Sequence, residues 1–298
     1  MPNVTLRQLA YFDALARHGH FGRAAEACAV SQPALSMQIK ELEQTLGAAL
    51  FERSGRAVGL TAFGEVFAER VREILRSVDE LGALARTSRD ELAGPLRIGV
   101  IPTVAPYLLP RIVGNLTQLH PDLDIRLRES ITPTLIRELG EGRLDAALVA
   151  LPVSEPSFEE VALFTEAFVL VRPLADAGKP APAPETLASM KLLLLEEGHC
   201  FRQQALSFCA LSSVRPRELM DASSLSTLVQ LVGAGIGVTL IPEMAVSVET
   251  RSAPVSVVRF EEPQPSRTIG MIWRKSSPIA PQLVRVSQAV GRLAPAPA

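Results

Sequence analysis

A cysteine late in the chain, Cys200, has the surroundings of a reactive thiol. It lies where a helix is predicted to begin, over residues 201–211, so the thiol would sit near the positive end of the helix dipole. His199 and Arg202 can add positive charge or hydrogen bonds. Each of these features favours the thiolate, the form that attacks peroxide. A second cysteine, Cys209, is flanked by apolar residues and is expected to be buried as a resolving thiol.

The nine-residue separation of Cys200 and Cys209 determines what a disulfide between them requires. On a continuous helix, nine residues at about 100° each place the thiols on opposite sides, roughly 13 Å apart along the axis. A disulfide needs Cα atoms about 4.4–6.8 Å apart, so the helix would have to unwind. A redox switch has this property, because oxidation then selects a second conformation.

Two other interpretations of the cysteines stay open on the residues alone. Buried cysteines are commonly small, inert hydrophobic residues, and Cys28, on a predicted packed helix, is expected to be one. A zinc site is disfavoured because a Cys-x8-Cys pair with one adjacent histidine lacks the usual close pairing of ligands. We therefore expect no metal and no cofactor.

The composition is that of a globular protein of about two domains. The chain has 298 residues, of which 47% are hydrophobic and 21% charged. With 30 basic and 32 acidic residues the net charge is −2, which excludes a polybasic coat but not a small basic face. No apolar run approaches the ~18 residues of a membrane span. The N-terminal segment lacks a signal-peptide core, so we expect a cytoplasmic protein, in which structural disulfides are rare.

The first sixty residues are predicted to form three helices and a hairpin tipped by arginines. The helices are expected to end near Gly19, to span 21–28 and to span 33–46, and the hairpin to span 49–60. A three-helix bundle of any kind is one interpretation, and a winged helix-turn-helix with its third helix in the major groove is the other. The residues expected to contact bases or phosphates are Ser31, Gln32, Pro33, Ser36, Gln38, Lys40, Arg53 and Arg56.

A long helix is predicted from residue 61 to about 89. Its apolar residues recur at alternating intervals of four and three, which is a heptad seam. One alternative is a helix that packs only on its own domain. We favour dimerisation because both flanks of the seam are charged. The seam consists of Phe67, Val71, Ile74, Val78, Leu81 and Ala85.

From about residue 93 predicted strands alternate with predicted helices, which indicates an α/β domain with a parallel sheet covered by helices. The segment 173–184 is expected to be a surface loop and 294–298 a frayed tail. The expected strands are 96–101, 123–127, 146–151, 168–171, 192–195, 237–241 and 268–273, and the expected helices are 107–119, 132–141, 201–211, 224–234 and 280–293.

The head and its hairpin resemble a known family. The resemblance is carried by the run Ser31-Gln-Pro-Ala-Leu-Ser-Met-Gln-Ile39, with Leu42-Glu43, Gly47, Leu50-Phe-Glu-Arg53, Arg56, Leu60-Thr61 and Gly64. These residues are similar to the N-terminal domain of LysR-type transcriptional regulators, and the likeness continues along the whole chain. Met37 differs, because many members carry arginine there.

The resemblance implies a domain organisation. It places a winged helix-turn-helix DNA-binding domain at 1–60, a dimerising linker helix and hinge at 61–92, and a regulatory domain at 93–298. That domain would consist of two α/β lobes like a periplasmic binding protein, joined by two crossing strands. Lobe I would comprise about 93–164 and 268–298, and lobe II about 165–267. Assembly as a dimer of dimers is also implied.

The cysteine segment resembles that of hydrogen-peroxide-responsive members of the family, as do Ile101–Pro110 and Arg267–Gly270. This resemblance implies that Cys200 reacts with peroxide and that Cys209 is its disulfide partner. Thr103 and Thr132 would hold peroxide at the cleft, and Arg267 would stabilise a departing hydroxide. Gln203 replaces a common aspartate, and Leu211-Ser-Ser-Val214 replaces a more glycine-containing loop. The implied pocket is Thr103, Thr132, His199, Gln204 and Arg267, with Arg202 beside it.

The leading hypothesis is a regulator, not an enzyme, that binds promoter DNA and senses hydrogen peroxide through a Cys200–Cys209 switch. Its expected partners are a second copy of the chain, RNA polymerase and a cellular thiol reductant, with no membrane. A LysR-type regulator that binds a metabolite in the cleft, its cysteines incidental, is the alternative. A thiol peroxidase would need a reductant site, and a stand-alone solute-binding protein would not need the head.

Overall fold

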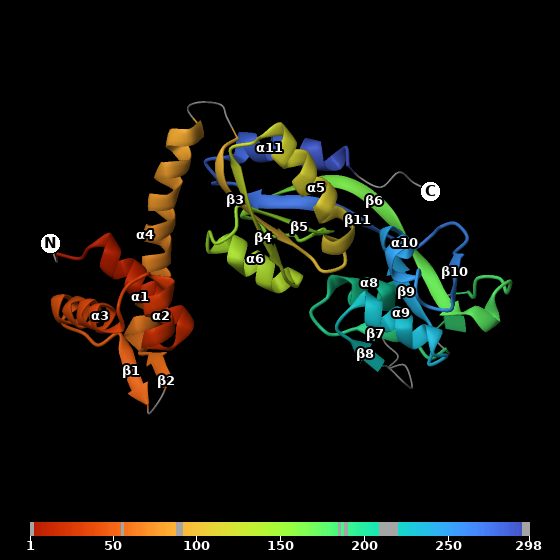
Figure 1. Ribbon diagram of the computed structural model, residues 1–298, viewed down its shortest axis with the longest axis horizontal. Coiled ribbons are helices and arrows are strands. Elements are labelled where there is room, and N and C mark those ends of the chain that lie inside the picture. Colours follow the sequence, from red (N-terminus) through yellow and green to blue (C-terminus); the bar gives the residue numbers. More distant parts are fainter. Residues whose placement is uncertain are drawn as a thin grey trace. The chain divides into compact units, whose positions relative to one another are not determined.

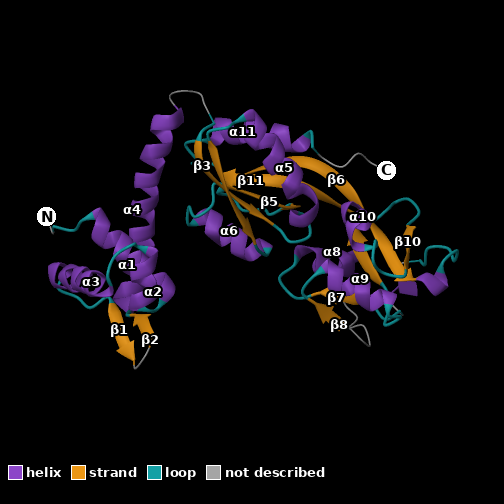
Figure 2. Ribbon diagram, in the orientation of Figure 1, coloured by secondary structure: helices purple, strands orange, loops and turns teal. Residues whose placement is uncertain are grey.

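The computed structural model describes residues 3–54, 57–87, 92–183, 186–187, 190–208 and 220–293. The chain divides into two units, 1–85 and 86–298. Figure 2 shows that the first unit is mainly helical, whereas the second mixes strands and helices. Among the described residues, no helix is both long enough and apolar enough to cross a membrane.

The first unit is a three-helix head with a two-stranded wing, as the sequence predicted (Figure 1). Phe12, Leu35 and Leu42 are wholly buried in its core. Gly64 is required by close packing, since a Cβ there would lie 2.1 Å from the carbonyl oxygen of Leu50. The elements are α1 (Leu6–His18), α2 (Phe21–Ala27), α3 (Gln32–Leu46), β1 (Phe51–Ser54), β2 (Ala57–Leu60) and α4 (Ala62–Thr87).

Local signals fix the ends of the head helices. The Ser31 hydroxyl accepts a hydrogen bond from the backbone N–H of Ala34, which caps α3 as predicted. Gly19 and Gly47 end α1 and α3 in the left-handed region, with φ of 58° and 69°. These boundaries follow from short-range chemistry, which explains why the sequence locates them.

The predicted seam on α4 divides into two parts. Val71 is buried in the head core, and Phe67 packs edge-on against Phe12 with ring centres 5.1 Å apart. Ile74, Val78 and Leu81 are exposed within this chain. The first half of the seam therefore anchors α4 to its own head, and only the second half is open to a partner helix. The side chain of Ala85 lies outside what the structure describes.

The main sheet of the second unit is mixed, which corrects the expectation of a parallel sheet. Its order is β10-β6-β11-β5-β3-β4, with β9 also paired to β6. Only β3–β4 and β3–β5 are parallel pairs in it. A separate parallel pair, β7–β8, lies outside this sheet. The strands are β3 (Gly94–Val100), β4 (Leu123–Glu129), β5 (Ala146–Leu151), β6 (Phe158–Pro173), β7 (Leu193–Leu195), β8 (Met220–Ala222), β9 (Thr239–Pro242), β10 (Val255–Arg259) and β11 (Ser266–Arg274).

Strand β6 connects two α/β lobes. Its first part, from Phe158 to Ala167, pairs with β11, and its last part pairs with β9 and β10. The sequence predicted only 168–171 of this strand. The first part of β6 consists mostly of exposed and partly exposed residues, so it lacks the continuous buried run that marks residues 168–172. The helices described in this unit include α5 (Ala105–Leu119), α6 (Thr132–Gly140), α8 (Cys200–Phe208), α9 (Leu225–Gly233), α10 (Val246–Glu249) and α11 (Ala280–Gly291), with 3-10 turns at Leu174–Asp176 and Glu243–Ala245.

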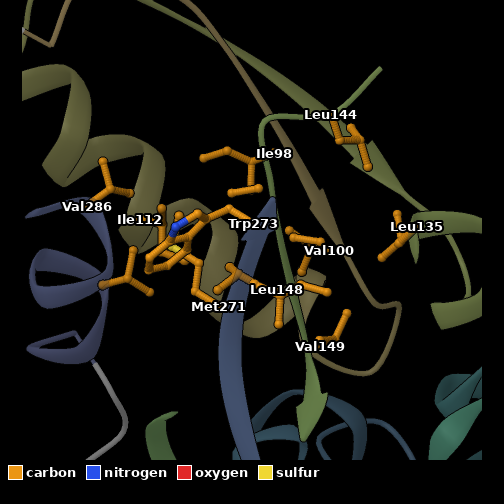
Figure 3. Close-up of a cluster of buried hydrophobic side chains, with 14 of the residues drawn as sticks. Ile98, Val100, Ile112, Leu135, Leu144, Leu148, Val149, Met271, Trp273 and Val286 are labelled. Atoms are coloured by element: carbon orange, nitrogen blue, oxygen red, sulfur yellow. The ribbon is translucent and has the colours of Figure 1, made fainter. Parts of the chain in front are cut away.

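Each lobe has its own hydrophobic core. In the first, Trp273 and Met271 of β11 pack with Ile112 of α5 and Val286 of α11 (Figure 3). The second core gathers Phe168, Phe201 and residues of β7, β9 and α9. Two cores joined mainly by β6 and β11 place the start of α8 at the junction, where the cysteine lies.

Candidate functional site

Cys200 lies between the two cores. It is the first residue of α8, and its side chain packs against the first core, whereas the neighbouring Phe201 is buried in the second. The thiol is half-buried and forms no disulfide. Cys209, the predicted partner, lies outside the described residues. A change at the Cys200 thiol is therefore placed to alter the packing of both lobes.

The loop before Cys200 is shaped by Gly198. Its φ is +94°, a conformation that side chains disfavour. A Cβ at this position would lie 2.8 Å from Cδ1 of Ile131, the residue before α6. Glycine thus allows Ile131 of the first lobe to pack on the loop that presents the thiol.

A buried cation, Arg267 on β11, lies next to α8. Its Nε donates to Oε1 of Glu166 at 2.8 Å, and Nη1 donates to the Thr103 hydroxyl at 2.7 Å. Nη2 donates to the Thr103 carbonyl at 3.0 Å. The guanidinium lies 5.4 Å from the ring centre of Phe201, a cation–π distance. One side chain therefore fixes β6, the turn after β3 and the first turn of α8.

The carboxyl group of Glu166 balances this cation. Burial raises the pKa of Glu166 above its ordinary value, and the ion pair with Arg267 opposes part of that rise. The Arg267 side chain has no exposed surface. Its observed partners are Glu166, Thr103 and Phe201, and it is not among the residues that line the cavity described below.

Two predicted pocket residues carry buried oxygen atoms without a hydrogen bond to the protein. They are Oγ1 of Thr132, at the first residue of α6, and Oε1 of Gln204. Gln204 follows Cys200 by four residues and therefore shares its helix face. Buried polar atoms usually have a partner. Each of these two oxygens is therefore an acceptor that a buried water molecule could satisfy.

A cavity of about 310 Å³ is lined by residues of both lobes. Of the predicted pocket residues, Thr103 and His199 line it; Cys200, Thr132, Arg202, Gln204 and Arg267 are not among the lining residues. Its walls consist of Pro102, Thr103, Pro106, Tyr107, Glu129, Ser130, Ile131, Leu195, His199, Ser223, Ser224, Leu225, Ser226 and Glu249.

Sequence reasoning missed a polar bridge in this cavity. The Tyr107 hydroxyl donates to Oε1 of Glu249 at 2.6 Å, and the Ser226 hydroxyl donates to Oε2 at 2.5 Å. Burial raises the pKa of Tyr107 well above its usual range, and the carboxylate of Glu249 adds to this, so the phenol stays protonated. Tyr107 lay within the motif 101–110, but nothing in the sequence pointed to Glu249.

The sequence predicted that His199 and Arg202 add positive charge or hydrogen bonds near the thiol, and the structure bears on the charge of each. Burial lowers the pKa of His199 below its ordinary value, which favours a neutral imidazole near pH 7. Nη1 of Arg202 donates to the Leu195 carbonyl at 2.7 Å and to Asp221 at 2.5 Å. Arg202 therefore joins β7 to β8, with its charge balanced by Asp221.

The predicted DNA face of the head is mostly exposed. Ser31, Gln32, Pro33 and Lys40 are exposed, and Ser36 is half-buried. Nε2 of Gln38 donates to Glu41 at 2.7 Å, so its side chain is engaged within α3. Arg53 lies on β1, opposite Val58 in the hairpin register. Arg56 lies outside the described residues.

Comparison with known proteins gives the class. Residues 6–65 match the bacterial regulatory helix-turn-helix domain of the lysR family, and residues 89–294 match the LysR substrate binding domain. The chain therefore belongs to the LysR family of bacterial transcription regulators.

Its relatives define the particular branch. The chain is 40% identical over 291 residues, 96% of this chain and 95% of the relative, to the DNA-binding transcriptional dual regulator OxyR of Escherichia coli. It is 42% identical over 290 residues, 96% of this chain and 93% of the relative, to a probable hydrogen peroxide-inducible genes activator of Streptomyces viridosporus.

Solved structures agree with these relatives. A full-length cysteine-to-aspartate variant of Pseudomonas aeruginosa OxyR is similar with a TM-score of 0.77 and 37% identity, covering 98% of this chain and 95% of that one. A hydrogen-peroxide-bound cysteine-to-serine variant of Corynebacterium glutamicum OxyR has a TM-score of 0.67 and 34% identity, covering 98% and 92%.

Proposed function

We propose that this protein is a transcription regulator that binds promoter DNA through α3 and the wing and senses hydrogen peroxide through Cys200. The observation that carries the proposal is the position of the half-buried Cys200 thiol at the start of α8, packed on one lobe while Phe201 packs in the other. The relatives named for hydrogen peroxide support the same chemistry.

The proposed reaction takes two steps. The Cys200 thiolate attacks one peroxide oxygen, the O–O bond breaks, and the leaving hydroxide takes a proton to give water and Cys200 sulfenic acid. The Cys209 thiol then attacks the sulfenic sulfur, forming an S–S bond and releasing a second water. Two electrons pass from the cysteine pair to peroxide. Two equivalents of a cellular thiol reductant return them when the switch is reset.

We assign the roles of the surrounding residues from their contacts. Thr103 lines the cavity, and its hydroxyl, which accepts from Arg267, keeps a proton to donate to peroxide. Oγ1 of Thr132 and Oε1 of Gln204 accept hydrogen bonds from peroxide hydroxyls. His199, as a neutral imidazole, donates or accepts a hydrogen bond at the cavity wall.

We propose that forming the disulfide unwinds at least the start of α8 (Cys200–Phe208), because residues nine apart on a continuous helix are too distant to bond. The ring centre of Phe201 now lies 5.4 Å from the Arg267 guanidinium and 4.8 Å from the ring centre of Phe168. Unwinding moves the Phe201 ring away from both. We propose that this repacking changes the lobes and the spacing of the DNA-binding heads. In this proposal the DNA-binding head is residues 1–60, the linker helix and hinge are 61–92, and the regulatory domain is 93–298.

The exposed half of the α4 seam, Ile74, Val78 and Leu81, is proposed to pair with α4 of a second copy. Two such dimers would form the tetramer, and RNA polymerase would be the further partner at the promoter.

We propose that the protein works in the cytoplasm, where its DNA and its thiol reductants are found.

The test is a free-thiol count with peptide mapping before and after a few equivalents of hydrogen peroxide. The reduced chain has three cysteines, and we expect loss of two thiols, mapped to Cys200 and Cys209 and restored by reductant. Cys28→Ser should lose the same two. Cys200→Ser should bind DNA and show no peroxide-induced change in DNA affinity. Survival of both thiols in the wild-type protein under these conditions overturns the switch.

A second function is favoured by the cavity itself. Its volume of about 310 Å³ and its polar wall, including Glu129, Glu249 and four serines, exceed what peroxide needs. A small metabolite bound there would make this a ligand-responsive regulator with incidental cysteines. A rise in melting temperature with a small-metabolite panel, together with unreactive thiols, would support this function over the first.

A further inference from the structure

Met37 is an exposed apolar side chain in the middle of α3. It is 56% exposed, whereas the apolar residues on either side of it along the chain, Leu35 and Ile39, are buried at 0% and 2%. Met37 is not part of the hydrophobic core of the head. Its flexible thioether is therefore available to a partner of the head.

The surroundings of Met37 indicate what kind of partner fits. Pro33, Met37 and Lys40 are all exposed and recur at intervals of four and three, so they share one helix face. The face begins with two apolar residues at the N-terminal half, the half that contacts base edges in helix-turn-helix proteins. It continues with the Lys40 cation, which complements a phosphate.

The polar residue next to Met37 is turned to another face. Gln38 donates to Glu41, and both line a hollow between α3 and the start of α1, together with Asn3, Thr5 and Gln8. Gln38 is thus occupied in the free head. At the centre of α3, Met37 is exposed, whereas its chain neighbours Ser36 and Gln38 are half-buried.

We propose that Met37 determines DNA sequence specificity by packing against the C5-methyl group of a thymine in the major groove. The proposal rests on the proposed function that α3 binds there. Thymine is the one base that presents a methyl group in this groove, and apolar side chains recognise it by contact. The unbranched, polarizable Met side chain adapts to such a surface.

The test uses the full-length protein and the duplex most enriched from a random library. Each thymine in turn is replaced by deoxyuridine, which removes only the methyl group. We expect one thymine in each half-site at which the replacement weakens binding about fourfold, the order of effect of burying one methyl-sized group. In Met37→Ala the same replacement should have no effect.

Lys40→Ala is the matched control, because Lys40 lies one turn along the same face. It should weaken binding to all duplexes alike and reduce the salt dependence, while leaving the deoxyuridine effect at about fourfold. If wild-type protein and Met37→Ala respond equally to every deoxyuridine, the assignment of Met37 is overturned. If no duplex is enriched at all, the DNA-binding function itself fails. Equal DNA binding with altered self-association in Met37→Ala would assign this residue to a protein contact instead and overturn the proposal.

Discussion

Helices α3 and α8 carry the two proposed activities, and they are stabilised in different ways. Helix α3 has a serine cap, a left-handed glycine at its end and three buried residues within one small core. Helix α8 follows a loop whose Gly198 has a positive φ, and it places Cys200 against one lobe and Phe201 against the other. A recognition helix needs one fixed shape, whereas a switch helix needs a shape that depends on contacts that can be changed.

The largest effect is expected from the contact that holds α8 across the lobes. Arg267→Met leaves Glu166 buried without its partner and should lower the free energy of unfolding of the regulatory domain by about 3–5 kcal/mol. Urea unfolding measures this change. The ion pair of Arg126 with Asp124 is exposed, with 66% and 55% of the side chains accessible, so Arg126→Met is expected to cost at most about 1 kcal/mol.

The double variant Arg267→Met with Glu166→Met sharpens this test. Removing both charges should recover a large part of the stability, because the unpaired buried carboxylate is then absent. If Arg267→Met and Arg126→Met have equal effects, the buried network is not what fixes the first turn of α8.

Gly198→Ala should cost about 2 kcal/mol, because it combines a left-handed backbone with a contact of 2.8 Å to Ile131. Gly47→Ala, at the end of α3, has a φ of +69° and nothing within 4 Å, so it should cost only about 1 kcal/mol. Urea unfolding of the two units gives both values. Adding Ile131→Val should recover part of the Gly198→Ala loss and none of the Gly47→Ala loss.

Ser31→Ala removes the side-chain cap of α3 and should destabilise the head by about 1 kcal/mol. The regulatory domain should be unaffected, since α3 depends on local chemistry. Thermal unfolding followed by circular dichroism measures the change in the head. An equal loss in peroxide-induced thiol oxidation would contradict the independence of the two helices.

The smallest effect is a pH dependence from His199. Burial lowers its folded-state pKa, so the unfolded state binds the proton first as pH falls through the ordinary value of about 6.5. The contribution of His199 to the free energy of unfolding is therefore fully present above pH 6.5, and it decreases as pH falls towards the folded-state pKa of His199. Urea midpoints at pH 7.5 and 5.5 should differ less in His199→Asn than in the wild-type protein. The comparison between the two proteins removes the opposite contribution of Glu166, whose folded-state pKa is raised.

The head was largely predictable from sequence because its determinants are short-range. Ser31, Pro33 and Gly47 mark the ends of α3, and the periodic Leu35, Ile39 and Leu42 mark its buried face. The heptad seam was predictable only as a pattern. Whether Val71 packs on its own head or on a partner depends on where α4 leaves the core, and the structure shows that it packs on the head.

In the second unit the sequence predicted the alternation of strands and helices, and the structure brings two of the predicted site residues, Thr103 and Arg267, into contact. The sequence did not reveal the direction of the long β6, because strand direction depends on pairing between distant segments. It also missed Glu249, which reaches Tyr107 across 142 residues of chain. The tertiary structure alone decided that Arg202 pairs with Asp221 while Arg267 holds Thr103, since a guanidinium binds whichever acceptors the fold brings within reach.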